Sequence, residues 1–191
     1  IVNDDLSGFT RVPMEFGKSS DRIQNTLAYA QLITSGNYTS ANTGTAGAPS
    51  ATTVGALRKL MRLRTALGAT GATSRPLNLV PKILIVPPAH EVVALALKAT
   101  IYPATASDAK DAQFQDLIVV VDGALTNANK WYMAADPNAY EGIVYNYLAG
   151  ENGVVLDTFY SQDDGNLIVQ ARLAFTVNVV DSKALAYNAG V

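Results

Sequence analysis

The chain has 191 residues, of which 49% are hydrophobic and 16% are charged, and its formal net charge is −2 at pH 7. It has no cysteine and one histidine, which excludes disulfides, thiolate metal sites, cysteine nucleophiles and a multi-histidine metal site within one chain. The negative charge without a basic tail argues against specific nucleic-acid binding, and no apolar run approaches the roughly 18 residues of a membrane span.

One long amphipathic helix is predicted near the start of the chain. Asp4 or Asp5 can cap it, and Pro13 either lies in its first turn or kinks it. Its apolar and small residues recur at steps of three and four: Val12, Phe16, Ser19, Ile23, Leu27 and Ala30. Residues 35–53 are almost entirely small and polar with Gly and Pro, so we expect a surface loop there.

A second helix is predicted after this loop, capped by Thr52 or Thr53. Its inward-facing residues are expected to be Val54, Leu57, Leu60 and Met61, and its basic residues, which lie mostly elsewhere, are Arg58, Lys59, Arg62 and Arg64. Four basic residues so close together could bind nucleic acid. A solvated face or an ion-pair surface between subunits is favoured, because no aromatic stacking residues interleave and the net charge is negative.

The middle of the chain predicts a strand that turns directly into a helix. Lys82 to Val86 is a nearly all-apolar run between prolines, which indicates a strand buried on both faces. Pro87 and Pro88 end the strand and begin the helix, where Glu91 and Lys98 complement the helix dipole. The apolar stripe of this helix is expected to be Ala89, Val92, Val93 and Ala96.

The remaining strands fall into two groups. Residues 117–121 indicate another fully buried strand, and residues 131–135 a third, so a mixed sheet covered by helices is expected. Residues 143–148, 154–160 and 167–177 are separated by turn sequences and predict an antiparallel meander with one buried face. Residues 182–188 are expected to return and complete the first sheet.

Candidate chemistry is sparse. His90 has no G-x-S-x-G elbow to serve, so a structural or surface histidine is favoured over a catalytic one. Asp157, Asp163 and Asp164 lack the spacing of a calcium loop, and a hairpin turn explains them. Asp4 and Asp5 fit helix capping better than acid-base catalysis. We therefore expect no catalytic, cofactor-binding or metal-binding residues.

Three stretches carry a resemblance to a known family. They are Pro81-Lys82 with the apolar run to Val86, Pro87-Pro88-Ala89 and Glu91; Val2-Asn3-Asp4-Asp5-Leu6 with Phe9-Thr10-Arg11-Val12-Pro13; and Trp131-Tyr132 with Ala135-Asp136-Pro137. In this order and at this spacing they resemble the major head subunits of Mu-like tailed phages and prophages, some of which are fused to a prohead protease. The similarity covers nearly the whole chain.

This resemblance implies the Hong Kong 97-type capsid fold, an α+β fold with two lobes. Residues 1–52 and 142–178 would form the peripheral lobe, with a long spine helix and an antiparallel sheet, and residues 53–141 and 179–191 the axial lobe, with a helix-covered mixed sheet. The chain begins at Ile1 without methionine, so we expect a processed product that lacks the family's N-terminal arm and most of its extended loop. The residues expected to pack the spine helix are Val12, Phe16, Ile23 and Leu27, and those expected at a subunit interface are Arg58, Lys59, Arg62 and Arg64.

The function that the resemblance implies is structural: a self-assembling capsid subunit, without cofactor, that forms the icosahedral shell around a phage genome. Its partners would be further copies in pentamers and hexamers, with a prohead protease, a scaffold and a portal, and its location the virion after assembly in the bacterial cytoplasm. Some capsids of this fold are crosslinked between lysine and asparagine, but no motif selects Lys18, Lys130 or Asn138. The alternatives are an encapsulin-like compartment shell and a small α/β enzyme or ligand-binding module. The low charged fraction has two explanations that the sequence does not separate. Either much of the surface is covered by other subunits, or the protein is an ordinary globular protein rich in alanine and threonine.

Overall fold

The computed structural model describes residues 6–66, 74–98, 114, 116–163 and 165–191, with side chains from residue 11 onward. The chain divides into two compact units, each built from two separate stretches. Unit 1 comprises Ile1–Leu32 and Val144–Asn178, and unit 2 comprises Ile33–Ile143 and Val179–Val191. Segments far apart in the sequence are therefore brought together in each unit.

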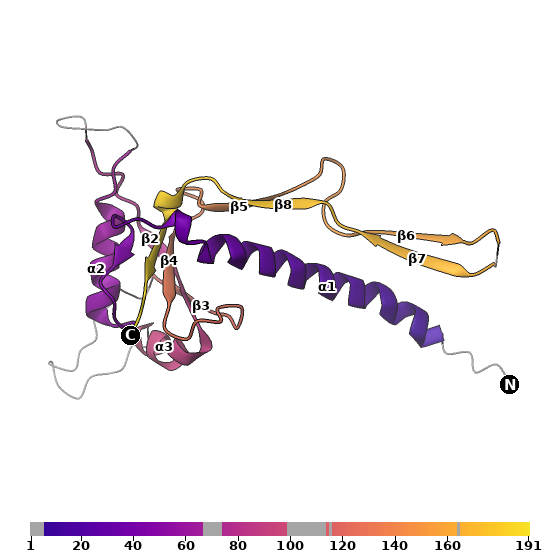
Figure 1. The fold of residues 1–191 in the computed structure, drawn as a ribbon, viewed down its shortest axis with the longest axis horizontal. Helices are drawn as coiled ribbons and strands as arrows, with labels where there is room; N and C mark the ends of the chain where they lie inside the picture. The colour runs from indigo at the N-terminus through magenta and orange to yellow at the C-terminus, as the bar shows by residue number, and fades with distance from the viewer. Residues whose placement is uncertain (1–5, 67–73, 99–113, 115, 164) are drawn as a thin grey trace. The chain divides into compact units, whose positions relative to one another are not determined.

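Unit 1 contains the predicted long helix and most of the predicted meander (Figure 1). Helix α1 runs over Leu6–Ile33 and includes Pro13 in its interior. Strand β6 (Val155–Tyr160) pairs antiparallel with β7 (Leu167–Arg172), and β5 (Ile143–Tyr147) pairs with β8 (Phe175–Val179). The single long strand expected over residues 167–177 is thus two strands, interrupted after Arg172, and the meander is two separate two-stranded sheets. The expected capping residues Asp4 and Asp5 lie outside the described residues.

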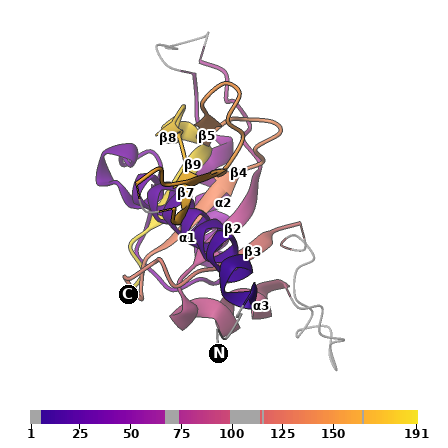
Figure 2. The same ribbon diagram turned by 90° about the vertical axis from the view of Figure 1, so that its right-hand side faces the viewer.

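Unit 2 is built on a five-stranded mixed sheet in the order β1-β9-β4-β2-β3. Its strands are β1 (Thr43–Gly44), β2 (Pro81–Val86), β3 (Ile118–Val121), β4 (Trp131–Ala135) and β9 (Leu185–Asn188). The pairs β1-β9 and β2-β3 are parallel, while β4 runs antiparallel to both β2 and β9. Figure 2 shows β4, β2 and β3 in this order across the sheet. The predicted return of residues 182–188 is confirmed, through a 3₁₀ turn at Ser182–Ala184 and β9.

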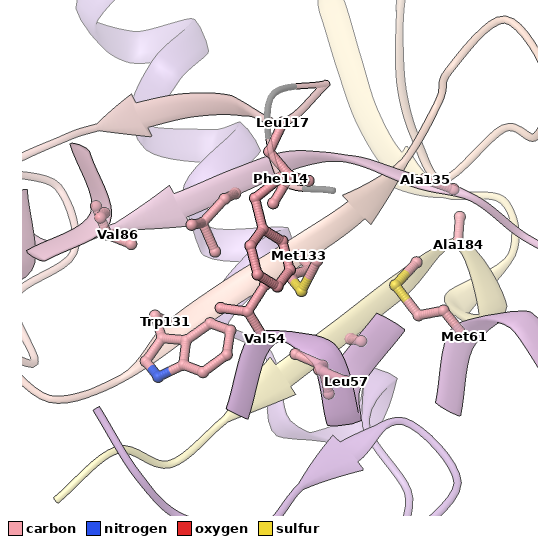
Figure 3. Packing of buried hydrophobic residues seen from close by; sticks show 13 residues of the cluster. Val54, Leu57, Met61, Val86, Phe114, Leu117, Trp131, Met133, Ala135 and Ala184 are labelled. Atoms are coloured by element: carbon pink, nitrogen blue, oxygen red, sulfur yellow. The ribbon is translucent and has the colours of Figure 1, made fainter. Parts of the chain in front are cut away.

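One face of this sheet is covered by helices α2 (Ala51–Arg62) and α3 (Glu91–Lys98), which share one buried cluster with it. Val54 and Leu57 of α2 lie against Trp131 and Met133 of β4 (Figure 3). The inward set predicted for α2 is confirmed, since Val54, Leu57 and Met61 are fully buried and Leu60 packs against the same cluster. Burial of each such side chain contributes about 1.5–3 kcal/mol, so this cluster supplies much of the stability of unit 2.

The cap of α2 is Ser50 rather than Thr52 or Thr53. The Ser50 side chain accepts a hydrogen bond from the Thr53 amide, and the Thr53 hydroxyl accepts one in return from the Ser50 amide at 2.9 Å. Two otherwise unpaired amide groups at the start of the helix are thereby satisfied. The prediction missed this because the third residue of the helix, whose side chain bonds back to the cap, is Thr53 here and usually Glu or Gln in such capping boxes.

Two apolar segments are less buried than predicted. Strand β3 lies at an edge of the sheet, and its Ile118 is 47% exposed. In β2, Leu84 and Val86 are fully buried but Ile83 and Ile85 are only partly so, because the described helices α2 and α3 pack on the face that carries Leu84 and Val86. Apolar runs in these strands indicated two buried faces, and this prediction was wrong for both.

The apolar stripe predicted for α3 was also wrong. Residues Pro88–His90 form a separate 3₁₀ turn, and the α-helix begins only at Glu91. The face that packs on the core therefore carries Ala94 and Leu97, whereas Val92 is 80% exposed. A stripe counted from Ala89 was out of phase with the helix because the two helix types differ in residues per turn.

The polar segment 35–53 is part of unit 2 rather than an unattached loop. It forms a 3₁₀ turn at Ser35–Asn37, strand β1 and the cap of α2. Its anchor is Asn42, 1% exposed, whose Nδ2 donates to the carbonyl oxygens of Asn37, Ser182 and Leu185 at 3.0–3.2 Å. The division between the two compact units falls after Leu32.

Candidate interaction surfaces

A basic groove lies on the outer face of α2. Its volume is about 490 Å³, and it is lined by Gly55, Arg58, Lys59, Arg62 and Leu63. The Arg58 guanidinium carbon is 5.5 Å from the centre of the Phe114 ring. Burial lowers the pKa of Arg58, and neighbouring Arg62 lowers it further, while Asp116 opposes the change. Three of the four predicted basic residues thus share one surface that suits acidic groups.

Arg64, the fourth predicted residue, does not line this groove. It follows the end of α2, and its Nη1 is buried without a hydrogen-bond partner. Burial lowers the pKa of Arg64, an effect that Asp181 and Tyr140 partly oppose. Asp181 is itself hydrogen-bonded to the Tyr140 hydroxyl at 2.5 Å and paired with Lys183 at 2.9 Å. Arg64 therefore belongs to a polar network within unit 2.

The predicted spine-helix residues are only partly covered within the chain. Val12, Ile23 and Leu27 are 42%, 50% and 44% exposed, and Phe16 is partly buried. Phe16 and Ile23 line a groove of about 150 Å³ within unit 1, together with Ser19, Ser20, Val154, Ala171, Arg172 and Leu173. The Tyr147 hydroxyl donates to Gln24 at 2.7 Å, which ties the helix to β5. Much of the apolar stripe of α1 remains open to solvent.

The β6-β7 hairpin also exposes apolar side chains. One of its faces carries Leu156, Thr158 and Tyr160 from β6 and Leu167, Val169 and Ala171 from β7. Leu156 and Leu167 are 43% and 42% exposed, and Tyr160 is 72% exposed. The predicted buried face is therefore largely open in this hairpin, whereas Val177 of β8, on the same predicted face, is buried. A two-stranded hairpin is at best marginally stable alone in water, so these side chains favour a covering partner.

A pocket lined by three tyrosines lies on the face of the sheet opposite α2. Tyr132 and Tyr187 are register partners on β4 and β9, and their ring centres are 5.8 Å apart. Tyr38 packs on both, at 5.8 Å from Tyr132 and 5.1 Å from Tyr187, and Lys130 Nζ is 5.7 Å from the Tyr187 ring centre. The volume of this tyrosine pocket is about 410 Å³, and its remaining lining residues are Ile33, Ser35, Thr39, Ser40 and Thr43.

The tyrosine pocket is rich in hydrogen-bond donors. Burial raises the pKa of Tyr38, and the neighbouring phenols add to the effect; burial likewise raises the pKa of Tyr132. Both phenols therefore stay neutral and keep their protons at physiological pH. Sequence analysis missed this cluster because Tyr38 stands in the polar segment 35–53, although strand alternation places Tyr132 and Tyr187 on the sheet face opposite the core.

His90, Lys18 and Asn138, which were considered for catalysis or crosslinking, each make a contact within their own unit. His90 Nε2 is 3.3 Å from the Asn129 carbonyl oxygen, a contact that ties a turn to a loop. Within the described part of the chain, no three His, Cys, Asp or Glu residues are grouped so that they could hold a metal ion. Of the possible crosslinking residues, Lys18 pairs with Glu15 at 2.7 Å on α1, and the Asn138 amide bonds to Asp136. Among the described residues, no helix is long and apolar enough to cross a membrane.

Comparison with known proteins gives a family match over almost the entire chain. The model of a family described as phage capsid protein matches residues 1–188. A similar solved structure is the SrpI encapsulin complex from Synechococcus elongatus, with a TM-score of 0.53 and 16% sequence identity. This similarity covers 98% of the chain but 66% of the encapsulin chain, so the chain spans less than two thirds of that protein. A search of curated proteins found no match.

Proposed function

The chain belongs to the phage capsid protein family, and from this we propose that it is the major capsid subunit of a tailed phage or prophage, whose copies form the icosahedral head shell around the genome. The observation that carries the proposal is the family match over residues 1–188. Capsid and encapsulin subunits share the Hong Kong 97-type fold, and the mixed α/β architecture of the two units agrees with it. The work of such a subunit is binding to its own copies rather than catalysis.

Within this family, we assign the chain to the Mu-like branch. The support is the set of motifs at residues 2–13, 81–91 and 131–137. Such a subunit assembles in the bacterial cytoplasm into pentamers and hexamers and ends in the virion. Its further partners are a prohead protease, a scaffold and a portal, and its shell need not bind the packaged DNA specifically, in keeping with the net charge of −2.

The two compact units are proposed to be the two lobes of the capsid subunit. Unit 1, with α1 as the spine helix and the β6-β7 hairpin, corresponds to the peripheral lobe, and unit 2, with the five-stranded sheet, to the axial lobe. The support for the first is its long helix beside two-stranded antiparallel pairing, and for the second its helix-covered mixed sheet. Residues 33–52, which include β1, then belong to the axial lobe.

Exposed apolar side chains support assembly through several surfaces. Val12, Ile23 and Leu27 on α1, Leu156 and Tyr160 on the hairpin, and Val92 on α3 are each more than 40% exposed. A standard protein interface buries about 800 Å² on each partner. Each contact can therefore be modest, while the closed shell is very stable because every copy is held at several interfaces at once.

The basic groove on α2 is proposed to bind acidic side chains of a neighbouring copy in the axial contacts. Arg58, Lys59 and Arg62 line it, so replacing all three by Ala should raise the protein concentration needed for assembly while leaving the fold intact. Lys98→Ala is the matched control, because Lys98 is an exposed basic residue that lies outside the groove. Unchanged assembly of the triple variant would exclude this groove from the interface.

The proposed function is tested by electron microscopy of the full-length gene product, expressed with and without any adjacent protease gene. Closed shells, or rings with five and six members, are the expected result. A uniformly monomeric particle under both conditions would contradict the capsid assignment and favour the small enzyme or ligand-binding module.

A second candidate is a compartment shell that encloses proteins, favoured by the structural similarity to an encapsulin. The contents of purified shells distinguish the two candidates. A capsid should package nucleic acid when the other phage genes are present, seen as a high ratio of absorbance at 260 nm to 280 nm and as nuclease-protected DNA. Shells that instead retain a protein cargo and no protected nucleic acid would favour the compartment.

A further inference from the structure

The tyrosine pocket, defined by Tyr38, Tyr132, Tyr187 and Lys130, has a definite chemical preference. Its rings offer aromatic surface, and its phenols and the hydroxyl groups of neighbouring Ser and Thr residues offer donors. The described residues that line it include one cation, Lys130, and no carboxylate. Lys130 has no ion-pair partner among the described residues. An occupant that fits carries an aromatic ring close to an anionic group.

The volume of the pocket limits the shape of this occupant. A space of about 410 Å³ holds a few side chains on a narrow support, not a second secondary-structure element. An α-helix with its side chains is about 10 Å across, so the exposed helix surface at Glu91 and Val92 is too broad to enter. A tight turn with a projecting ring is the right size.

The chain itself carries such a turn at the end of the β6-β7 hairpin. Tyr160, the last residue of β6, is 72% exposed, the highest value among the aromatic residues described as exposed. Asp163 follows in the turn and, among the described residues, has no ion-pair partner. Two backbone hydrogen bonds connect described residues of the turn: the Ser161 amide donates to the Asn166 carbonyl at 2.8 Å, and the Gly165 amide donates to the Ser161 carbonyl at 3.0 Å. Tyr160 and Asp163 are three residues apart in the sequence, at the same end of the hairpin.

The other exposed aromatic or apolar residues near a carboxylate fit less well. Met14 lies beside Glu15, but Glu15 is paired with Lys18 at 2.7 Å. Ile118 lies near Asp116, but Asp116 acts on Arg58 of the basic groove. Tyr145 has no acidic residue within its strand, β5. Compared with these three, the hairpin turn combines an exposed ring, a carboxylate without an ion-pair partner among the described residues, and a narrow shape.

We propose that the β6-β7 turn of one copy inserts into the tyrosine pocket of a neighbouring copy, with Tyr160 against the tyrosine rings and Asp163 paired with Lys130. This inference rests on the proposed function, because it names one of the contacts by which the subunits assemble. The contact is heterologous, since turn and pocket are different surfaces, and each copy both gives a turn and receives one. Such contacts generate rings when the rotation closes.

Charge reversal tests the pairing in the full-length protein. Lys130→Glu and Asp163→Lys each place like charges together and should raise the concentration for half-assembly about tenfold, measured by size-exclusion chromatography with light scattering. The double variant Lys130→Glu/Asp163→Lys restores opposite charges and should assemble like the wild type. Tyr160→Ala should weaken assembly, whereas Tyr160→Phe, which keeps the ring, should not.

A mixing experiment shows whether the contact forms between copies. Equimolar Lys130→Glu and Asp163→Lys proteins, each weak alone, should assemble together, because each turn then meets a pocket of opposite charge on the other variant. Failure of the mixture or of the double variant to recover assembly overturns the proposal, as does wild-type assembly by Lys130→Glu alone. Circular dichroism of the unassembled variants verifies that they are folded.

Asp157→Lys is the matched control, because Asp157 lies on the same hairpin but away from the turn. Combined with Lys130→Glu it should give no recovery, and equal recovery would show a general effect of net charge and overturn the pairing. The two proposals fail differently. Absence of shells in the wild type contradicts the capsid function itself, whereas shells that are indifferent to all of these variants contradict the turn-and-pocket contact alone.

Discussion

Replacement of Asn42 by Ala should strongly destabilise unit 2, although Asn42 stands in a segment whose composition is that of a loop. Its Nδ2 donates to the carbonyl oxygens of Asn37, Ser182 and Leu185 at 3.0, 3.2 and 3.0 Å, and its Oδ1 accepts from the Thr39 amide at 2.6 Å. A typical hydrogen bond contributes a net of about 1 kcal/mol, and Nδ2 has two protons for its three acceptors. Loss of about three effective bonds should therefore lower the free energy of unfolding by about 3 kcal/mol.

Urea unfolding followed by far-ultraviolet circular dichroism measures this loss, and calorimetry should show a Tm about 6–12 °C lower, at about 2–4 °C per kcal/mol for a chain of this size. Asn42→Asp separates volume from hydrogen bonding, because it keeps the size and Oδ1 but removes the donor group. It should be at least as destabilising, since a carboxylate then faces three carbonyl oxygens. Thr45→Ala, exposed in the same segment, is the control and should change stability by less than about 0.5 kcal/mol.

The reasoning would be refuted if Asn42→Ala stayed within about 0.5 kcal/mol of the wild type, as surface substitutions do. Such a result would mean that residues 35–50 are attached to the sheet too loosely for their hydrogen bonds to matter. The Tyr187 amide donates to the Asn42 carbonyl at 2.9 Å. If the variant lost protection from hydrogen exchange at this amide but kept most of its free energy of unfolding, the effect would be limited to the edge of the sheet.

Three further predictions concern unit 2. Ser50→Ala removes the cap of α2 and should cost about 1 kcal/mol in urea unfolding, whereas Ser50→Gly should cost a few tenths. Trp131 is fully buried and its Nε1 donates to the Gly47 carbonyl at 2.9 Å, so its fluorescence should be blue-shifted and resist acrylamide; an emission typical of exposed indole in the folded protein would contradict this. The hydrogen bond from Lys82 lowers the pKa of Asp136 below its ordinary value of 3.8. This interaction stabilises the folded protein fully above pH 3.8, and the stabilisation is lost as the pH falls through the lower pKa of folded Asp136. In Lys82→Met, the free energy of unfolding, measured by urea titration at several pH values, should therefore fall less steeply with acid.

The sequence patterns that predicted structure correctly were those with a strong period or a clear boundary. The spacing of three and four residues between Val54, Leu57 and Met61 placed the inner face of α2, and the apolar run at residues 131–135, which ends at Asp136-Pro137, placed β4. In each case the local pattern agrees with the tertiary packing, because the apolar face is covered by other residues of the same unit.

The patterns that misled are those whose meaning depends on distant partners. The apolar run at β3 could not reveal that the strand lies at an edge, and the polar run at 35–53 could not reveal that Asn42 finds acceptors about 140 residues later. The same holds for exposure: the stripe on α1 and the alternation in the hairpin predicted burial, but within one chain these side chains remain open. Periodicity reports that a face is apolar, and not whether the covering atoms belong to the same chain.

Of the candidate interaction residues, the basic cluster of α2 was visible in the sequence, whereas the separation of Arg64 from the groove was not, because the helix ends at Arg62. The tyrosine pocket required the register of β4 with β9 and the docking of Tyr38, which no local signal encodes.

The strand order of unit 2 also bears on how the protein is made. Strand β9, the last in the chain, lies between β1 and β4 and is bonded to both, so the sheet has a gap until residues 185–188 are in place. A chain that is still being synthesised therefore cannot close this sheet before residues 185–188 have left the exit tunnel, and such long-range pairing is slow. Copies that are still being synthesised would thus present an incomplete unit 2 to one another. The position of β9 therefore makes closure of this sheet, and with it competence for assembly, wait for residues 185–188.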